Sequence, residues 1–128
     1  MLILYRSGTS SSTSQASSSP TSVVTTDCPD SNNTTYTPPA QGGGSGQYEF
    51  FKVCGASSEG SDLAEAFVAD FNNCVGLCSN WNAISYNLTG VKCSSVTFIV
   101  SAGPPGNCWA KNSSGYHVDG SADAALLL

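Results

Sequence analysis

Six cysteines are the residues whose type and number could carry chemistry in this chain of 128 residues. Thiols either pair as disulfides or bind a soft metal such as zinc. An even number of cysteines in a small, charge-poor domain rich in Ser, Thr, Asn and Gly is typical of a disulfide framework. A four-sulfur zinc site usually has paired Cys-x-x-Cys knuckles, whereas this chain has one Cys-x-x-x-Cys pair and single distant partners. We therefore expect three disulfides and no bound metal from Cys28, Cys54, Cys74, Cys78, Cys93 and Cys108.

The other reactive side chains do not form a recognisable catalytic pattern. His117 is the only histidine, and the Gly-x-Ser-x-Gly motif of a nucleophilic serine does not occur. A glycosidase needs two carboxylates that face each other across a cleft. Glu59, Asp62 and Glu65 lie close in sequence, but within a Gly- and Ser-rich stretch that favours solvated surface acids. His117 and Asp119 are expected to form an exposed loop pair. We predict no enzymatic activity, no catalytic residue and no cofactor.

Trp109 is the best candidate for contact with a ligand. It follows Cys108 in an expected strand, so if Cys108 faces the interior, Trp109 and Lys111 face the opposite side. An indole beside Lys111 and Tyr116 could stack against a sugar ring or a partner side chain. The alternative is that Trp109 packs under the loop that follows it or against a neighbouring strand.

Charge and glycosylation motifs narrow the class of partner. Four Lys/Arg against nine Asp/Glu give a net charge of −5 with no basic cluster. We therefore do not expect the chain to bind nucleic acid through phosphate contacts. Four Asn-x-Ser/Thr motifs accompany the cysteines and favour secretion. Their candidate N-glycosylation sites are Asn32, Asn33, Asn87 and Asn112.

The N-terminal part of the chain reads as a linker. The apolar run before Arg6 is too short for a signal peptide or a membrane span, so we expect that a signal or anchor has been lost by truncation upstream. In residues 7–26, fourteen of twenty positions are Ser or Thr, and such a segment cannot build a core. It is either an O-glycosylated stalk or an ordinary disordered linker. We place the linker at residues 1–26 and the folded domain at 27–128.

One helix organises the expected fold. Asp70 is a suitable N-cap, and from it Phe71, Cys74, Val75 and Cys78, together with the preceding Phe67, share a sector of about 100° on a helix. Two thiols one turn apart therefore lie on the buried face of that helix. The remaining chain predicts strands at 34–37, 48–54, 84–88, 95–100, 108–111 and 124–128, an extended or irregular stretch at 62–68, and loops at 38–46 and 112–120. The expected fold class is α+β, with one helix packed on a small antiparallel sheet of about five strands.

The order of these motifs resembles the PAN/apple domain, in the form found in fungal secreted and cell-surface proteins. The matching residues are Cys28-Pro29, Tyr48, Cys54-Gly55, Phe71, Cys74, Cys78, Cys93, Val96, Phe98, Cys108, Trp109 and Lys111. The resemblance covers about residues 28–128, with a longer stretch between Trp81 and Lys92 than the family has, and with Ser95 where the family often has glycine. Spacing alone leaves fifteen pairings of six cysteines open. The resemblance implies Cys74–Cys108 and Cys78–Cys93, which leaves Cys28–Cys54.

The resemblance also implies a function. Domains of this family bind proteins or carbohydrates, so we expect an extracellular or cell-surface binding module whose partner is a carbohydrate or an extracellular protein. A structural spacer of a wall or adhesion protein is the alternative, and an accessory domain of a secreted enzyme is a more remote one. The sequence makes no prediction about the oligomeric state.

Overall fold

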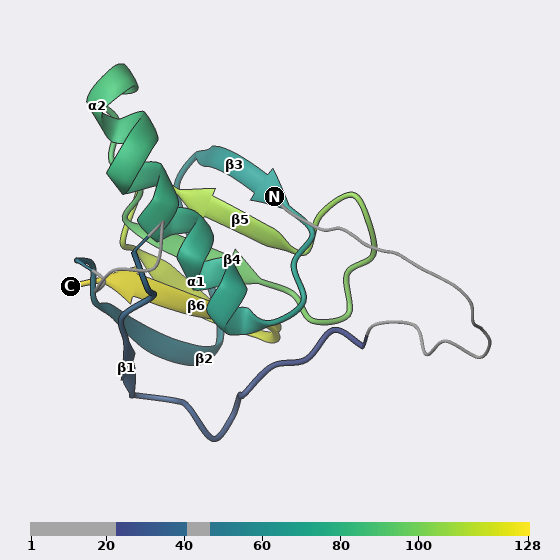
Figure 1. Cartoon of the computed structure of the whole chain (residues 1–128). Coiled ribbons are helices and arrows are strands. Elements are labelled where there is room, and N and C mark those ends of the chain that lie inside the picture. The colour runs from purple at the N-terminus through teal and green to yellow at the C-terminus, as the bar shows by residue number, and fades with distance from the viewer. Residues whose placement is uncertain (1–22, 41–46) are drawn as a thin grey trace.

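Six antiparallel strands form one sheet in the computed structural model, which describes residues 23–40 and 47–128. Predictions for residues 1–22 and 41–46 lie outside the described residues. One helix crosses a face of the sheet (Figure 1). This confirms the expected α+β class, with six strands rather than about five. In spatial order the strands are β1 (Thr35–Tyr36), β2 (Phe50–Ser58), β6 (Tyr116–Leu127), β4 (Ser95–Phe98), β5 (Cys108–Lys111) and β3 (Asp62–Ala66).

The helix α1 (Phe71–Asn80) begins where its sequence predicts. The Asp70 carboxylate accepts a hydrogen bond from the backbone N–H of Asn73 at 2.8 Å, which satisfies one of the unpaired amides of the first turn. The buried residues of α1 are the expected ones plus Ser79. Phe67 is a correction: it lies before the helix, with 39% of its surface exposed.

The packing of α1 on β4 and β5 makes the core. Phe71 stacks on Phe98 with 5.7 Å between the ring centroids, and Val75, Val96 and Ala110 are buried beside them. Hydrophobic burial of this kind supplies most of the folding free energy. One disulfide joins α1 to β5 and a second joins α1 to the segment just before β4, so the helix is held on the sheet by both packing and covalent bonds.

The structure pairs the cysteines as the family resemblance implies. Cys74 is bonded to Cys108, Cys78 to Cys93, and Cys28 to Cys54, and no cysteine is free. The first two bridges leave α1 from adjacent turns and are fully buried. The third joins the N-terminal segment to β2 and is partly exposed.

The predicted strand at 84–88 is wrong, because the helical rod continues past α1. It runs through a π-helical turn, η1 (Trp81–Ser85), into α2 (Tyr86–Thr89). No glycine or proline interrupts residues 81–89, and Gly90, with a φ of 73°, provides the left-handed C-cap that ends the rod. We call residues 81–89 the helical arm. In Figure 1 its α2 end extends away from the sheet.

The predicted loop at 112–120 is wrong from Tyr116 onward. Strand β6 begins there, and its first residues pair with the end of β2: Val118 lies opposite Ala56, whereas Asp123 lies opposite Cys54. Residues 119–122 therefore bulge opposite the single residue Gly55, whose φ of 70° is readily adopted only by glycine. The stretch has a loop-like composition, and it becomes a strand through its non-local pairing with β2.

Residues 23–26, which the sequence assigned to the linker, pack on the domain. Val24 contacts the core cluster, and the Thr25 N–H donates to the carbonyl oxygen of Ala69 at 3.0 Å. The Thr26 hydroxyl donates to the carboxylate of Asp123 at 3.1 Å. The folded region therefore includes residues before Asp27.

Candidate functional site

A hollow of about 450 Å³ lies between the helical arm and the segment that leads into β2. Its volume falls within the range of pockets that hold small molecules. We call it the amide groove, because four of its lining residues carry side-chain amides. Among the residues that the structure describes, those that line the groove are all uncharged: Ala40, Gln47, Tyr48, Ser79, Asn80, Asn82, Ala83, Tyr86 and Asn87.

One wall of the amide groove is held by Tyr48. Its side chain is half-buried against the core cluster. The Tyr48 hydroxyl donates to the backbone carbonyl of Asn82 at 3.4 Å, which connects the segment before β2 to the first turn of the arm. The phenol ring thus presents an aromatic surface from a fixed position.

The base of the arm is held by Asn82. Its Nδ2 donates to the carbonyl oxygen of Cys93, and the Cys93 N–H donates back to its Oδ1, each at 2.8 Å. The indole Nε1 of Trp81 donates to the carbonyl oxygen of Val91 at 2.7 Å. With the Cys78–Cys93 bridge, these bonds tie the returning chain to the base of the arm.

The π turn determines which residues of the arm face the groove. The Tyr86 N–H donates to the carbonyl oxygen of Trp81, five residues back, which is the bond that defines this helix type. A π turn accommodates an extra residue and rotates the side chains that follow relative to a regular α-helix. Such turns are frequent at functional sites.

The exposed residues of the groove offer two kinds of contact. Tyr86 is 39% exposed and gives an aromatic face, while the amides of Gln47, Asn80 and Asn87 are open to solvent. Each amide has both a donor and an acceptor group, as a sugar hydroxyl does. Stacking on tyrosine combined with paired amide hydrogen bonds suits a neutral, polyhydroxylated ligand.

The sequence-predicted ligand residues lie elsewhere. Trp109 is partly buried on β5, opposite Glu65 on one side and Thr97 on the other, and faces away from α1 as strand alternation requires. Lys111 is engaged by Asp62, with 2.8 Å between Nζ and Oδ1. Tyr116, 47% exposed, starts β6 opposite Ser58 of β2.

Two of the acidic residues near β3 lie against basic side chains. Asp62 forms the ion pair with Lys111, and the Nδ1 of His117 lies 3.3 Å from the carboxylate of Glu59, with both side chains more than half exposed. The expected pair of His117 with Asp119 is therefore replaced by one with Glu59. Asp119 instead accepts from the N–H and hydroxyl of Ser121, and these hydrogen bonds lower the pKa of its carboxyl.

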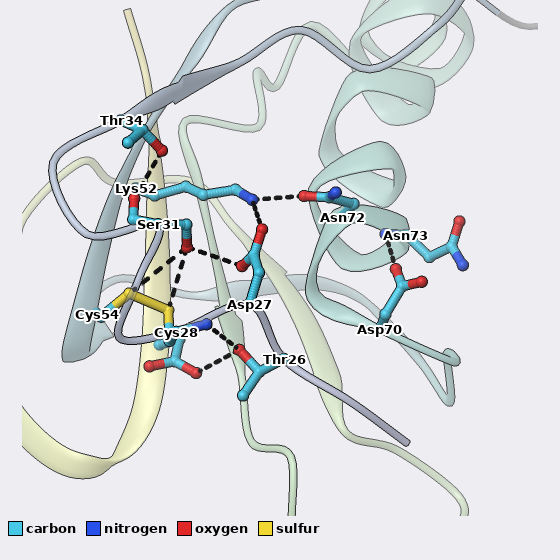
Figure 2. Close-up of polar contacts among 11 residues, drawn as sticks. Thr26, Asp27, Cys28, Ser31, Thr34, Lys52, Cys54, Asp70, Asn72 and Asn73 are labelled. Carbon is cyan, nitrogen blue, oxygen red and sulfur yellow. Dashed lines mark hydrogen bonds and ion pairs between the residues drawn. A yellow bond between two sulfur atoms is a disulfide. The ribbon is translucent and has the colours of Figure 1, made fainter. Parts of the chain in front are cut away.

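A buried lysine lies at the centre of an electrostatic cluster (Figure 2). Lys52 points from β2 toward α1, and its Nζ lies 2.7 Å from the carboxylate of Asp27 and 2.5 Å from the amide oxygen of Asn72. The ammonium also lies 5.1 Å from the ring centroid of Tyr36 and 5.0 Å from that of Phe71. These contacts join the N-terminal segment, the sheet and the helix, so we assign Lys52 to the architecture of the domain.

The Lys52 cluster shifts two pKa values. Partial burial of Asp27 favours its neutral form, but hydrogen bonds from Lys52 and Ser31 outweigh it and lower the pKa of this carboxyl. Burial raises the pKa of the Tyr36 phenol, and the carboxylates of Asp70 and Asp27 add to that rise. Asp27 is therefore ionised at neutral pH.

A second hollow, of about 410 Å³, lies beside the Cys28–Cys54 bridge and has the Asp123 carboxylate in its lining. That carboxylate accepts from the Thr26 hydroxyl and, at 3.0 Å, from the Gly55 N–H. The two sulfurs and an Asp123 oxygen lie within 4.8 Å of one another. The sulfurs are bonded to each other, so they are not available as thiolate ligands for a metal.

All four candidate glycosylation sites are exposed. The Oδ1 of Asn32 accepts from the Cys54 N–H at 2.9 Å, and that of Asn112 accepts from the Ser61 N–H at 2.9 Å. Asn33 has a φ of 65°. Asn87 belongs to α2 and lines the amide groove.

Comparisons with protein-family models, with characterised proteins and with solved structures find no match for this chain. The PAN/apple resemblance therefore stays a prediction made from the cysteine pattern. Within the described parts of the chain, no helix combines the length and the hydrophobicity that crossing a membrane requires.

Sequence reasoning did not find the amide groove. The signal available was the density of Asn and Tyr between Asn80 and Asn87, which an isolated apolar strand at 84–88 does not explain. The missing information was spatial, because Gln47 and Tyr48 join the groove from more than thirty residues earlier in the chain.

Proposed function

We propose that this chain is an extracellular, non-catalytic module that binds carbohydrate in the amide groove. The observation that carries the proposal is the lining itself: among the described residues it offers two tyrosines and three solvent-open amides, those of Gln47, Asn80 and Asn87, and no charged group. Ionic ligands and phosphates would lack a countercharge there. Sugar rings offer apolar faces for the tyrosines and hydroxyls for the amides. Three disulfides in a small domain are compatible with an extracellular location.

The test is an oligosaccharide-binding measurement on the full chain. The protein is produced in a bacterial periplasm, where disulfides form, and titrated with neutral glucan, mannan and chitin oligomers. We expect weak binding to one of these classes that does not change between low and high salt, because the groove carries no charge. Failure of all neutral oligomers to bind would favour a structural spacer.

Two matched variants locate the site. Tyr86→Ala removes an exposed ring from the groove, and Tyr116→Ala removes an exposed ring from the distant start of β6. By analogy with base stacking, one ring contributes about 1–3 kcal/mol, so Tyr86→Ala should weaken binding roughly tenfold or more. Tyr116→Ala should leave it unchanged. The reverse result would place the ligand on the face of Trp109, Lys111 and Tyr116.

A further inference from the structure

Asn87 has two roles that meet at one place: it lines the amide groove, and it begins an Asn-Leu-Thr glycosylation motif. Of the four acceptor asparagines, Asn87 alone lines this groove. Its side chain is exposed on α2, and Tyr86 is its neighbour both in sequence and in the lining. We propose that N-glycosylation of Asn87 closes the amide groove, so that occupancy of this one motif controls binding. The proposal rests on the carbohydrate-binding function above.

The modification joins the sugar directly to a groove residue. A bond forms between Nδ2 of Asn87 and C1 of the first sugar of a lipid-linked oligosaccharide pyrophosphate. The bond between C1 and the pyrophosphate oxygen breaks, the lipid pyrophosphate leaves with the electron pair, and the amide loses one proton. The product retains one N–H and the carbonyl oxygen on Asn87. The first sugar is then attached at the rim of a hollow whose lining suits sugar rings.

A tethered sugar competes strongly with a free one. Attachment through a short linker gives an effective concentration in the millimolar range. The tethered sugar lowers binding of a free one by a factor of one plus the ratio of its effective concentration to its own dissociation constant, so a loss of about tenfold needs a dissociation constant of about a tenth of that concentration. The bulk of the attached oligosaccharide adds steric exclusion at the same rim. Both effects act in the same direction and reduce binding of external carbohydrate.

The competing arrangement places the glycan over an apolar surface instead of in the groove. The arm and the chain just after it expose Ile84, Leu88 and Val91, with Leu88 83% exposed. A glycan at Asn87 that lay over these residues would shield an apolar surface and leave the groove open. The two arrangements predict different results when the glycan is absent. If the glycan closes the groove, its loss increases binding of free carbohydrate; if it shields the apolar residues, its loss causes self-association.

The experiment compares variants of the full chain made in a host that N-glycosylates. Thr89→Ala removes the motif and keeps the Asn87 amide, whereas Thr89→Ser keeps the motif. Because the Thr89 hydroxyl bonds the carbonyl of Ser85 and the N–H of Val91, Asn87→Gln is a second variant without the motif that leaves those bonds intact. Ser114→Ala removes the exposed Asn112 motif, away from the groove, as a matched control. Occupancy is measured by mass spectrometry, and binding by titration with the neutral oligomers.

We expect an occupied Asn87 in the wild type and in Thr89→Ser, with weak binding. Thr89→Ala, which keeps the Asn87 amide, should bind at least tenfold more tightly. Asn87→Gln should also bind more tightly than the wild type, by a smaller factor because it alters one groove amide. Ser114→Ala should behave as wild type. An unoccupied Asn87, or equal binding with and without its glycan, would overturn the proposal and leave the carbohydrate-binding function standing. Self-association of Thr89→Ala without a gain in binding would overturn it in favour of shielding. If the periplasmic protein binds no neutral oligomer, the binding function itself fails.

Discussion

The side-chain amide of Asn82 is paired edge to edge with the backbone of Cys93. The Nδ2 donates to the Cys93 carbonyl oxygen and the Cys93 N–H donates to Oδ1, both at 2.8 Å, and both residues are buried. The pair repeats the hydrogen-bond pattern that two strands would make. It closes the chain segment between the arm and β4, next to the Cys78–Cys93 bridge. The geometry of the amide groove depends on it.

Asn82→Ala should therefore destabilise the domain. Two buried backbone groups of Cys93 lose their partners, at about 1–3 kcal/mol each, so we expect a loss of about 2–6 kcal/mol in the free energy of unfolding. Denaturant titration measures it. Asn73→Ala, at an exposed position of α1, is the matched control and should change stability by less than about 0.5 kcal/mol. Equal effects of the two changes would show that the pair with Cys93 contributes nothing.

Stability should fall in acid partly through Asp27. The pKa of Asp27 is lower in the folded chain than its ordinary value, so its stabilising contribution is fully present above the unfolded pKa of about 4. That contribution is lost as the pH drops through the lower folded pKa. Asp27→Asn lacks it at every pH. The wild type should be more stable than Asp27→Asn at pH 6, and the difference should shrink toward pH 2.

Asp119 provides a comparison for the pH experiment, because it is a second carboxyl with a lowered pKa. The hydrogen bonds from Ser121 lower this pKa, and Asp119 lies away from Lys52 at the bulge of β6. Asp119→Asn should therefore flatten the acid limb of the curve without affecting the Lys52 contacts. A gap between wild type and Asp27→Asn that stays constant from pH 6 to pH 2 would contradict the role of Asp27.

The disulfides should be reduced in a definite order. Cys28 and Cys54 are partly exposed, whereas the four cysteines of the other bridges are fully buried. Mild dithiothreitol should open Cys28–Cys54 first, and alkylation with peptide mapping would identify it. Early labelling of Cys74 or Cys78 would contradict the order.

The stability lost when each disulfide is removed should not follow the order that loop length predicts. The Cys28–Cys54 bridge spans 26 residues and the Cys78–Cys93 bridge spans 15. Chain entropy alone therefore predicts that Cys28–Cys54 stabilises the domain more, by about 0.5 kcal/mol. Removing the two buried sulfurs of Cys78 and Cys93 leaves cavities, and the loss of about 1 kcal/mol for each sulfur outweighs that difference. The double alanine variant of Cys78 and Cys93 should lose more stability than that of Cys28 and Cys54. Thermal unfolding of the two variants decides between packing and entropy.

The N-terminal boundary can be tested by truncation. A chain that starts at residue 27 loses the core contact of Val24, the Thr25 bond to Ala69 and the Thr26 bond to Asp123. We expect it to be about 1–3 kcal/mol less stable than a chain that starts at residue 23. Equal unfolding midpoints would return the boundary to residue 27.

Local chemistry was sufficient to predict the helix and most of the sheet. Asp70 is a strong N-cap, and the spacing of Phe71, Cys74, Val75 and Cys78 specifies a buried face regardless of what covers it. The alternation of residues 95–98 and 108–111 specifies a hairpin in the same way. These signals arise between residues that are near one another in sequence, and so they can be read from it.

The errors concern segments whose state depends on distant partners. The apolar residues at 84–88 suit a strand or a helix, and the uninterrupted continuation from α1 to Gly90 decides for the helix. Residues 116–120 have the composition of a loop and become a strand by pairing with β2. The burial of Lys52 likewise depends on distant partners, because Asp27 and Asn72 meet its charge from two other segments.

The sequence by itself thus determined the fold class, the capped amphipathic helix, and a cysteine pattern whose resemblance implied the three pairs that the structure contains. Only the tertiary structure decided where a ligand could fit, because the amide groove joins Tyr48 to the arm across a gap of more than thirty residues. The physical reason is that capping, periodicity and strand alternation are local interactions. A groove is formed by the packing and hydrogen bonding of distant segments, for which no short stretch of sequence carries a signal.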